Sequence, residues 1–105
     1  MANDAFRALA HPLRRDIVER LSGGSATVAQ VTDGLGVSKP TISRHLRVLE
    51  EAGVVTRVID GRRHRLSLEP QTLAEVSRWI DSQRLRWERL FDVVGEYLEE
   101  RKERR

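Results

Sequence analysis

The chain has 105 residues, of which 39% are hydrophobic and 33% are charged, and its formal net charge at pH 7 is +3. This length suits one domain with a modest core, and the composition is typical of a globular protein with a well-solvated surface. The absence of cysteine excludes disulfides, thiolate metal sites and thiol catalysis. No apolar run approaches the roughly 18 residues of a transmembrane helix, and the first ten residues lack the pattern of a secretion signal. We therefore expect a cytoplasmic protein that binds no membrane.

The first part of the chain predicts two short helices. Asn3 or Asp4 can cap the first helix, which carries Phe6, Leu9 and Ala10. Pro12 suits the first turn of the second helix. Four apolar residues of that helix are expected to point inward and four charged ones outward: Leu13, Ile17, Val18 and Leu21, and Arg14, Arg15, Glu19 and Arg20. The SGGS stretch at residues 22–25 ends it as a flexible turn.

A third helix is expected over residues 28–35. Thr27 supplies a capping hydroxyl, and Val28, Val31 and Leu35 are its apolar residues. Gly36 ends the helix, because glycine reaches the left-handed conformation of a C-cap without steric cost.

Residues 38–53 predict a fourth, longer helix. Ser38 can cap it, Pro40 is tolerated in its first turn, and Gly53 ends it. One inward stripe follows the spacing i, i+4, i+7: Ile42, Leu46 and Leu49. Because only Val37 separates this helix from Gly36, residues 27–53 predict a helix-turn-helix.

A β-hairpin, or wing, is expected over residues 54–69. Residues 54–59 are β-branched except for Arg57, and Asp60-Gly61 is a strong hairpin signal. A two-residue turn there would place Ile59 opposite Arg62 and Val55 opposite Leu66.

A last helix is expected over residues 71–101, and its apolar stripe is too long for one small domain to bury. An exposed stripe of this kind usually marks a partner surface. We expect it to be a homodimer seam; the alternative is that the helix folds back on its own domain. Gln83 interrupts the stripe, so a continuous helix and a bend there are both compatible with the pattern. The stripe comprises Leu73, Val76, Ile80, Trp87, Leu90, Phe91, Val94 and Leu98.

Positive charge is concentrated in the centre of the chain. Residues 38–65 hold seven Lys and Arg against three Asp and Glu, a net +4, whereas the remainder holds twelve against thirteen, a net −1. Such asymmetry is what a surface for a polyanion requires, although chance clustering on a solvated face is the alternative.

The fourth helix is expected to read double-stranded DNA. The second helix of a helix-turn-helix lies in the major groove and reaches base edges with its N-terminal residues. Steps of 100° per residue place a basic and hydroxylic face opposite the inward stripe. Arg44 is the best candidate for base discrimination, because arginine binds guanine through two parallel hydrogen bonds. The alternative is a face that is merely soluble. The face and the helix start comprise Ser38, Lys39, Pro40, Thr41, Ser43, Arg44 and Arg47.

The wing and the third helix add further candidate DNA contacts. Arg62 and Arg63 at the hairpin tip can track phosphates or enter a narrow minor groove. Arg57 and Arg65 on the strands either contact DNA or pair with an acidic neighbour, Glu50, Glu51 or Asp60. Thr27 and Gln30 at the start of the third helix can bond to phosphate.

Neither a metal site nor an enzyme is expected. The three histidines, His11, His45 and His64, lack a second histidine at i+3 or i+4, the spacing that places two ligands on one helix face. A site assembled in three dimensions is the alternative; otherwise His11 can cap the second helix and His45 is structural. No G-x-S-x-G elbow, P-loop or H-E-x-x-H motif is present. We therefore predict no catalysis and no cofactor.

The stretches FRALAHPLRRDIVERL, SKPTISRHLRVLEEAGVV and DGRRHRLSL resemble the ArsR/SmtB family of bacterial winged-helix repressors. The resemblance implies a mainly α fold with a small β-hairpin: one domain over residues 1–105, a winged helix-turn-helix with a long C-terminal dimerisation helix. It also implies a homodimer built from the first and last helices, which adds Phe6 and Leu9 to the seam, and a pseudo-palindromic operator.

The chain departs from many of those relatives in its ligands. It has no cysteine, and its last helix has no histidine, so it looks like the branch without metal-sensing sites; the resemblance leaves its effector unassigned. A second hypothesis is a winged-helix module that binds protein and has lost operator recognition.

Overall fold

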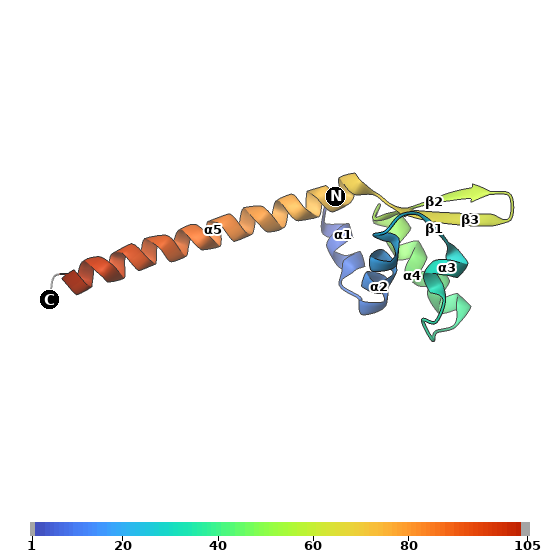
Figure 1. Cartoon of the computed structure of the whole chain (residues 1–105), viewed down its shortest axis with the longest axis horizontal. Helices are drawn as coiled ribbons and strands as arrows, with labels where there is room; N and C mark the ends of the chain where they lie inside the picture. The colour runs from blue at the N-terminus through green and yellow to red at the C-terminus, as the bar shows by residue number, and fades with distance from the viewer. Residues whose placement is uncertain (1, 104–105) are drawn as a thin grey trace.

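The computed structural model describes residues 2–103 as a small helical cluster with a β-hairpin wing and one projecting helix (Figure 1). Met1, Arg104 and Arg105 of the expected domain lie outside the described residues. The predicted fold class, mainly α with a small hairpin and a long last helix, is confirmed. The elements are α1 (Ala2–Leu9), α2 (Pro12–Leu21), β1 (Ala26–Thr27), α3 (Val28–Thr32), α4 (Lys39–Glu51), β2 (Val55–Asp60), β3 (Arg63–Leu68) and α5 (Pro70–Glu103).

Helix α2 begins as the sequence predicts. His11 is its N-cap, and the ring Nδ1 accepts a hydrogen bond from the Leu13 N–H at 3.1 Å. Pro12 then occupies the first helical position, where its missing N–H costs nothing.

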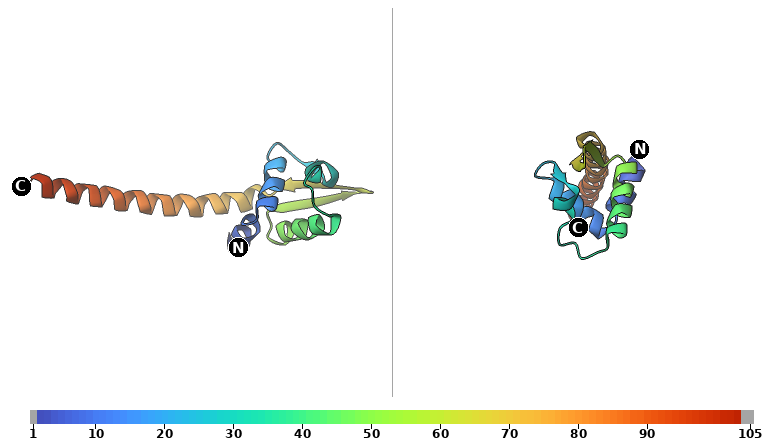
Figure 2. Two further views of the ribbon diagram at one scale, coloured as in Figure 1. Left: turned by 90° about the horizontal axis from the view of Figure 1, so that it is seen from below. Right: turned by 90° about the vertical axis from the view of Figure 1, so that its right-hand side faces the viewer.

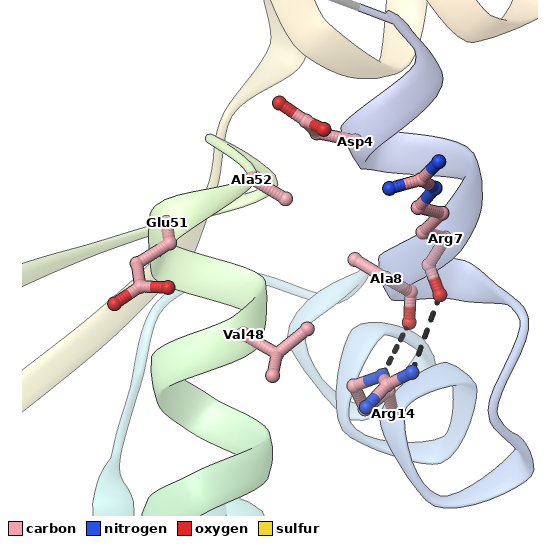
Figure 3. A pocket seen from close by; sticks show the side chains of 7 residues that line it. All are labelled: Asp4, Arg7, Ala8, Arg14, Val48, Glu51 and Ala52. Carbon is pink, nitrogen blue, oxygen red and sulfur yellow. Dashed lines mark hydrogen bonds between the residues drawn. The ribbon is translucent and has the colours of Figure 1, made fainter.

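Three arginines of α2 that were expected to point outward bond to the last carbonyls of neighbouring helices. Arg15 donates from Nη1 to the Leu9 carbonyl at 3.0 Å, at the end of α1. Arg14 donates from Nε to the Ala8 carbonyl at 2.6 Å and from Nη2 to the Arg7 carbonyl at 3.2 Å, at the end of α1 (Figure 3). Arg20 donates to the Val31 carbonyl at 2.9 Å, at the end of α3. The last carbonyls of a helix lack partners in the helix, so a cation there satisfies both their hydrogen bonding and the helix dipole.

The helix-turn-helix is confirmed, with a shorter first helix than expected. Thr27 caps α3 as predicted, but α3 ends at Thr32 rather than Leu35. The chain turns early because Gly34 and Gly36 both take left-handed φ angles, +72° and +71°.

Helix α4 has the predicted caps. Ser38 Oγ accepts from the Thr41 N–H at 3.4 Å, and Gly53, with φ +72°, ends the helix.

The hairpin is present, but its predicted register is wrong. Ile59 pairs with His64 and Val55 pairs with Leu68, so the turn residues are Gly61 and Arg62. A type I′ turn at Asp60-Gly61 needs a positive φ at both residues. Within residues 2–103 only glycines have positive φ; one such residue at the first turn position, Gly61, fits type II′. The shift of two residues leaves every side chain on its predicted face.

A third strand, β1, was not predicted. It adds Ala26 opposite Leu66 and Thr27 opposite Arg65, which gives the antiparallel order β1-β3-β2. Two residues are too few to show the alternation by which a strand is recognised.

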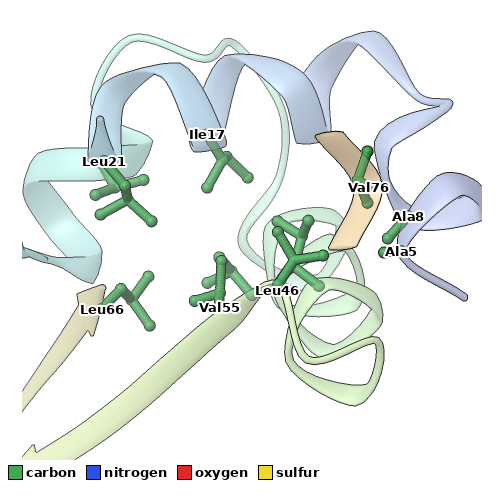
Figure 4. Packing of buried hydrophobic residues seen from close by; sticks show 11 residues of the cluster. Ala5, Ala8, Ile17, Leu21, Leu46, Val55, Leu66 and Val76 are labelled. Carbon is green, nitrogen blue, oxygen red and sulfur yellow. The ribbon is translucent and has the colours of Figure 1, made fainter. Parts of the chain in front are cut away.

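The core lies where α2, α4 and the base of the sheet meet (Figure 4). Leu46 and Leu49 are 1% and 0% exposed, which confirms the inward stripe of α4, while Ile42 is partly buried beside it. At one edge, Val76 of α5 packs with Ala5 and Ala8 of α1 (Figure 4). This contact attaches α5 to the domain.

Helix α5 is continuous through Gln83 and leaves the domain on the side opposite the wing (Figures 1 and 2). Beyond Val76, the Trp79 ring meets Phe6 edge-on, with 5.1 Å between centroids. The longest dimension is 74 Å and the radius of gyration is 20.3 Å, against about 13 Å for a compact domain of this length. The alternative in which the helix folds back on its own domain is therefore wrong.

Candidate nucleic-acid interface

The outer face of α4 is open to solvent. Ser38, Lys39, Pro40, Ser43, Arg44 and Arg47 are exposed, and Thr41 is partly exposed. The Ser38 hydroxyl lies 2.9 Å from the Thr41 hydroxyl and also caps the helix, so it has a structural role. Arg44 and Arg47 form no ion pair with any side chain of residues 3–102. Their guanidinium groups are thus free to bond to bases or phosphates.

The wing carries a second group of exposed cations. Arg62 is at the turn, Arg63 follows it, and Arg65 lies further along β3; all three are exposed. The described part of the chain offers them no carboxylate within ion-pairing distance. The wing therefore presents three unneutralised positive charges.

Arg57 differs from Arg63 and Arg65, the arginines of β3, because it is paired with Glu50 of α4. Its Nε donates to Glu50 Oε1 at 2.7 Å and its Nη2 donates to Oε2 at 3.1 Å. Its Nη1 lies 2.9 Å from Nδ1 of His64. The structure favours the ion-pair alternative for Arg57, and we withdraw this residue from the DNA-contacting set.

Thr27 and Gln30 form a capping box at the start of α3. Thr27 Oγ1 accepts from the Gln30 N–H at 3.2 Å, and Gln30 Oε1 accepts from the Thr27 N–H at 2.9 Å. The Gln30 amide nitrogen has no part in these bonds, so its contact with phosphate stays a prediction.

A cleft of about 450 Å³ lies between the start of α3 and the wing. Thr27, Arg62 and Arg63 line it, together with three residues that the sequence did not indicate, Val28, Ala29 and His64, and with Arg57. The sequence did not show this cleft because it depends on β1, which brings the start of α3 against β3.

The histidines are held in structural contacts. The His11 and His45 rings lie 4.4 Å apart, and Arg14 Nη1 lies 3.4 Å from His45 Nδ1. Burial lowers the pKa of His45 below 6.5, and the nearby positive charges of His11, Arg14 and Arg44 lower it further. Among the side chains that the structure describes, those of residues 3–102, no three His, Asp or Glu gather as a metal site would require.

A second cleft, of about 420 Å³, separates α1 from the C-terminal half of α4 (Figure 3). Val48 of α4 and Ala52, the C-cap of that helix, face Ala8 of α1 across it. Arg14 closes one end through its bonds to the Arg7 and Ala8 carbonyls (Figure 3). Its lining belongs to the α1–α4 contact and contains no pairing of nucleophile and base.

No helix in the described range, residues 2–103, is long and apolar enough to cross a bilayer. The helix-turn-helix, the exposed basic face of its second helix and the adjoining basic hairpin define the class: a winged helix-turn-helix DNA-binding protein.

Comparison with known proteins agrees with this class. A family model for a helix-turn-helix domain matches residues 9–58. The transcriptional repressor SdpR of Bacillus subtilis is 33% identical over 78 residues, which are 74% of this chain and 87% of that protein. The regulator Rv2034 of Mycobacterium tuberculosis is 40% identical over 77 residues, 73% of this chain and 72% of that protein. A crystal structure of an ArsR family regulator superposes with a TM-score of 0.76 at 32% identity, covering 82% of this chain and 89% of that one.

The chain belongs to the ArsR/SmtB family. It is a DNA-binding transcriptional regulator and not an enzyme.

Proposed function

We propose that this chain is a homodimeric repressor that binds a pseudo-palindromic operator. The observation that carries the proposal is the combination of two exposed surfaces on one chain: the unpaired basic face of α4 with the wing, and the apolar stripe of α5. SdpR is itself a repressor by name. Occupation of a promoter by such a dimer, in the cytoplasm, would block transcription.

The exposed surface of the single chain supports a dimer. Its accessible area is 8273 Å², about 2,200 Å² more than the roughly 6,000 Å² expected for a compact monomer of this mass. A standard interface buries about 800 Å² on each partner. The surplus is therefore large enough for a stable interface.

Large apolar side chains are exposed along one face of α5. Trp87, Leu90 and Phe91 are 60%, 53% and 61% exposed. Together with Val94 they line a depression of about 110 Å³ that has no polar lining residue. We propose that side chains of a second copy fill this depression, because a helix with apolar spacings of three and four complements another copy of itself.

The remaining residues of the proposed seam differ in how much of their surface is exposed and available to a partner. Ile80, Val94 and Leu98 are 49%, 45% and 55% exposed and can be covered by the partner. Phe6, Leu9 and Leu73 are partly buried against their own core, and Val76 is only 8% exposed. Val76 therefore acts mainly by fixing α5 to its own domain.

In the proposed complex, α4 lies in the major groove. Arg44 bonds to a guanine, and the neighbouring residues Ser38, Lys39, Pro40, Thr41, Ser43 and Arg47 divide between bases and phosphates. Arg62, Arg63 and Arg65 contact phosphates or the minor groove, and Thr27 and Gln30 add phosphate bonds at the start of α3. A two-fold dimer presents α4 to two half-sites about one helical turn, roughly 34 Å, apart.

We also propose that this regulator does not respond to metal. The sequence has no thiol ligand and no histidine on α5, and His11 and His45 use Nδ1 in contacts with their own chain. Added Zn²⁺ is expected to leave operator affinity unchanged; a specific release of DNA at stoichiometric metal would contradict this part.

Random-site selection with the full chain tests the proposal. We expect an enriched, two-fold symmetric motif, with an affinity that falls steeply as salt rises because phosphate contacts release counterions. Failure to enrich any motif would instead support the hypothesis of a protein-binding module. Light scattering at micromolar concentration tests the assembly, and a monomer there would overturn the seam.

A further inference from the structure

Three side chains from three elements meet beside the wing. Glu50 comes from the last turn of α4, Arg57 from β2 and His64 from β3. Arg57 bonds to both carboxylate oxygens of Glu50, at 2.7 and 3.1 Å, and to Nδ1 of His64 at 2.9 Å. We name this set the wing bracket.

The geometry of the wing bracket distinguishes it from an ordinary surface ion pair. The Arg57 and Glu50 side chains are only 25% and 28% exposed. A two-pronged arginine–carboxylate contact fixes orientation as well as distance, whereas a single exposed pair does not. Because a guanidinium can only donate, Nδ1 of His64 must accept. All three side chains are therefore held in one arrangement.

The outer half of the wing has little else to hold it. Val55 and Leu66 at its base are buried, but Val58 and Ile59 further out are 58% and 64% exposed. Strand β1 pairs with β3 only at Arg65 and Leu66. Among residues 2–103, the wing bracket supplies the only side-chain hydrogen bonds between the outer hairpin, residues 57–64, and the rest of the domain.

We propose that the wing bracket positions the wing tip relative to α4, so that Arg62 and Arg63 reach DNA while α4 lies in the major groove. Glu50, Arg57 and His64 are then positioning residues: Arg57 is neutralised by Glu50 and holds the strand that leads to the tip. This inference rests on the proposed function, but its first test does not require DNA.

Backbone dynamics of the free protein provide the first test. Glu50→Ala removes the carboxylate, and Glu51→Ala is the matched control, because Glu51 is an exposed neighbour on the same helix turn with no ion pair to residues 2–103. We expect the amide heteronuclear NOEs of Gly61, Arg62 and Arg63 to fall in Glu50→Ala and not in Glu51→Ala. Unchanged values in Glu50→Ala would overturn the proposal.

A second pair of variants separates positioning from folding. His64→Leu removes the acceptor that Arg57 uses, while His64→Asn retains one, because its Oδ1 stands at the position of Nδ1. We expect lower NOEs at the tip in His64→Leu and restoration in His64→Asn, with far-UV circular dichroism unchanged in both. Equal values in the two variants would contradict a role for the hydrogen bond.

Operator binding tests whether the wing bracket affects the contribution of the tip arginines to DNA affinity. Joint replacement of Arg62 and Arg63 by Ala should weaken binding on the order of tenfold and lower the salt slope by about 2 in the wild-type background. In the Glu50→Ala background the same replacement should cost less than about threefold, because the tip is no longer held at the DNA. In the Glu51→Ala background, replacement of Arg62 and Arg63 should weaken operator binding as much as it does in the wild type.

The outcomes separate the two proposals. If only the net charge mattered, Glu50→Ala and Glu51→Ala would have the same affinity for DNA, equal to or higher than that of the wild type, since each removes one negative charge. A full tenfold cost of the arginine replacements in all backgrounds would overturn the wing bracket while leaving DNA binding intact. If Glu50→Ala lowers the NOEs at the tip but the wild-type protein selects no DNA motif, the wing bracket stands and the proposed DNA binding is overturned.

Discussion

Helices α4 and α5 both carry an apolar stripe at helical spacing, but only the stripe of α4 is covered within one chain. Leu46 and Leu49 of α4 are 1% and 0% exposed, whereas Leu90 and Val94 of α5 are 53% and 45% exposed. The difference lies in the neighbours: α1, α2 and the sheet surround α4, while the last contact of α5 with its domain described above is that of Trp79 with Phe6. Apolar spacing thus identifies the face that will be buried but not the chain that will cover it.

The largest expected effect comes from making the same substitution on both helices. Leu49→Ala should lower the free energy of unfolding by about 2–5 kcal/mol, because it leaves a cavity in a closed core. Leu90→Ala should change it by less than about 0.5 kcal/mol at concentrations where the protein is monomeric, since the side chain is exposed there. Urea unfolding measures both, and equal losses would show that α5 is covered within the monomer.

The same contrast explains which elements the sequence could predict. The caps at His11, Thr27 and Ser38 depend on bonds to backbone two or three residues away, so the local sequence specifies them. Strand β1 depends on pairing with β3, a segment distant in the sequence. The hairpin register depends on the φ angle of one glycine, Gly61. The roles of Arg14, Arg15 and Arg20 were missed for a related reason. These side chains cap helices other than their own, and only the tertiary arrangement brings those carbonyls within reach.

The candidate site also contains residues that the local sequence could assign and residues whose role depends on tertiary packing. The outward face of α4 follows from rotation by 100° per residue about one helix, so Arg44 and Arg47 could be assigned without knowing the fold, and both are exposed. Arg57 and Arg65 lie on opposite faces of the hairpin, because Arg57 pairs with Leu66 and Arg65 pairs with Val58. From the sequence alone, the same two alternatives, DNA contact and ion pairing, were open for both arginines. What separates them is the position of Glu50, which the packing of α4 against β2 decides.

The next largest effect is expected where α5 lacks a partner in the monomer. Val94→Asp places a charge in the proposed seam on both copies, so the dimer should dissociate and operator affinity should fall on the order of 100-fold as bivalent binding is lost. Leu85→Asp is the matched control: Leu85 is 49% exposed, close to the 45% of Val94, and it lies on the opposite side of the helix from Trp87. Sedimentation velocity and fluorescence anisotropy measure the two properties.

An intact dimer in Val94→Asp, or equal dissociation in Leu85→Asp, would show that the apolar stripe is not the interface.

A smaller effect is expected on the outward face of α4. Arg44→Ala should weaken operator binding by about 1–3 kcal/mol and relax the preference at one base position. Arg44→Lys retains the charge but loses the two-pronged contact with guanine, so it should retain non-specific affinity and still lose the base preference. Binding to a library of single-position operator variants measures both quantities. If Arg44→Ala discriminates among the variants as wild type does, another residue reads that base.

The smallest expected effect is a pH dependence confined to the compact domain. His45, on α4, has its pKa lowered by burial and then by the positive charges of His11, Arg14 and Arg44. The unfolded chain therefore binds a proton that the folded protein resists, so the contribution of this residue to stability is present above pH 6.5 and is lost as the pH falls through the lowered pKa.

Thermal unfolding between pH 8 and pH 5 should show a weaker loss of stability in His45→Gln than in wild type, while the two pH profiles of dimerisation coincide because α5 has no histidine. Parallel stability profiles would indicate that the His45 proton is not linked to folding. A dimerisation profile that changed with His45→Gln would instead mean that α4 and α5 do not respond independently, and the contrast between them would fail.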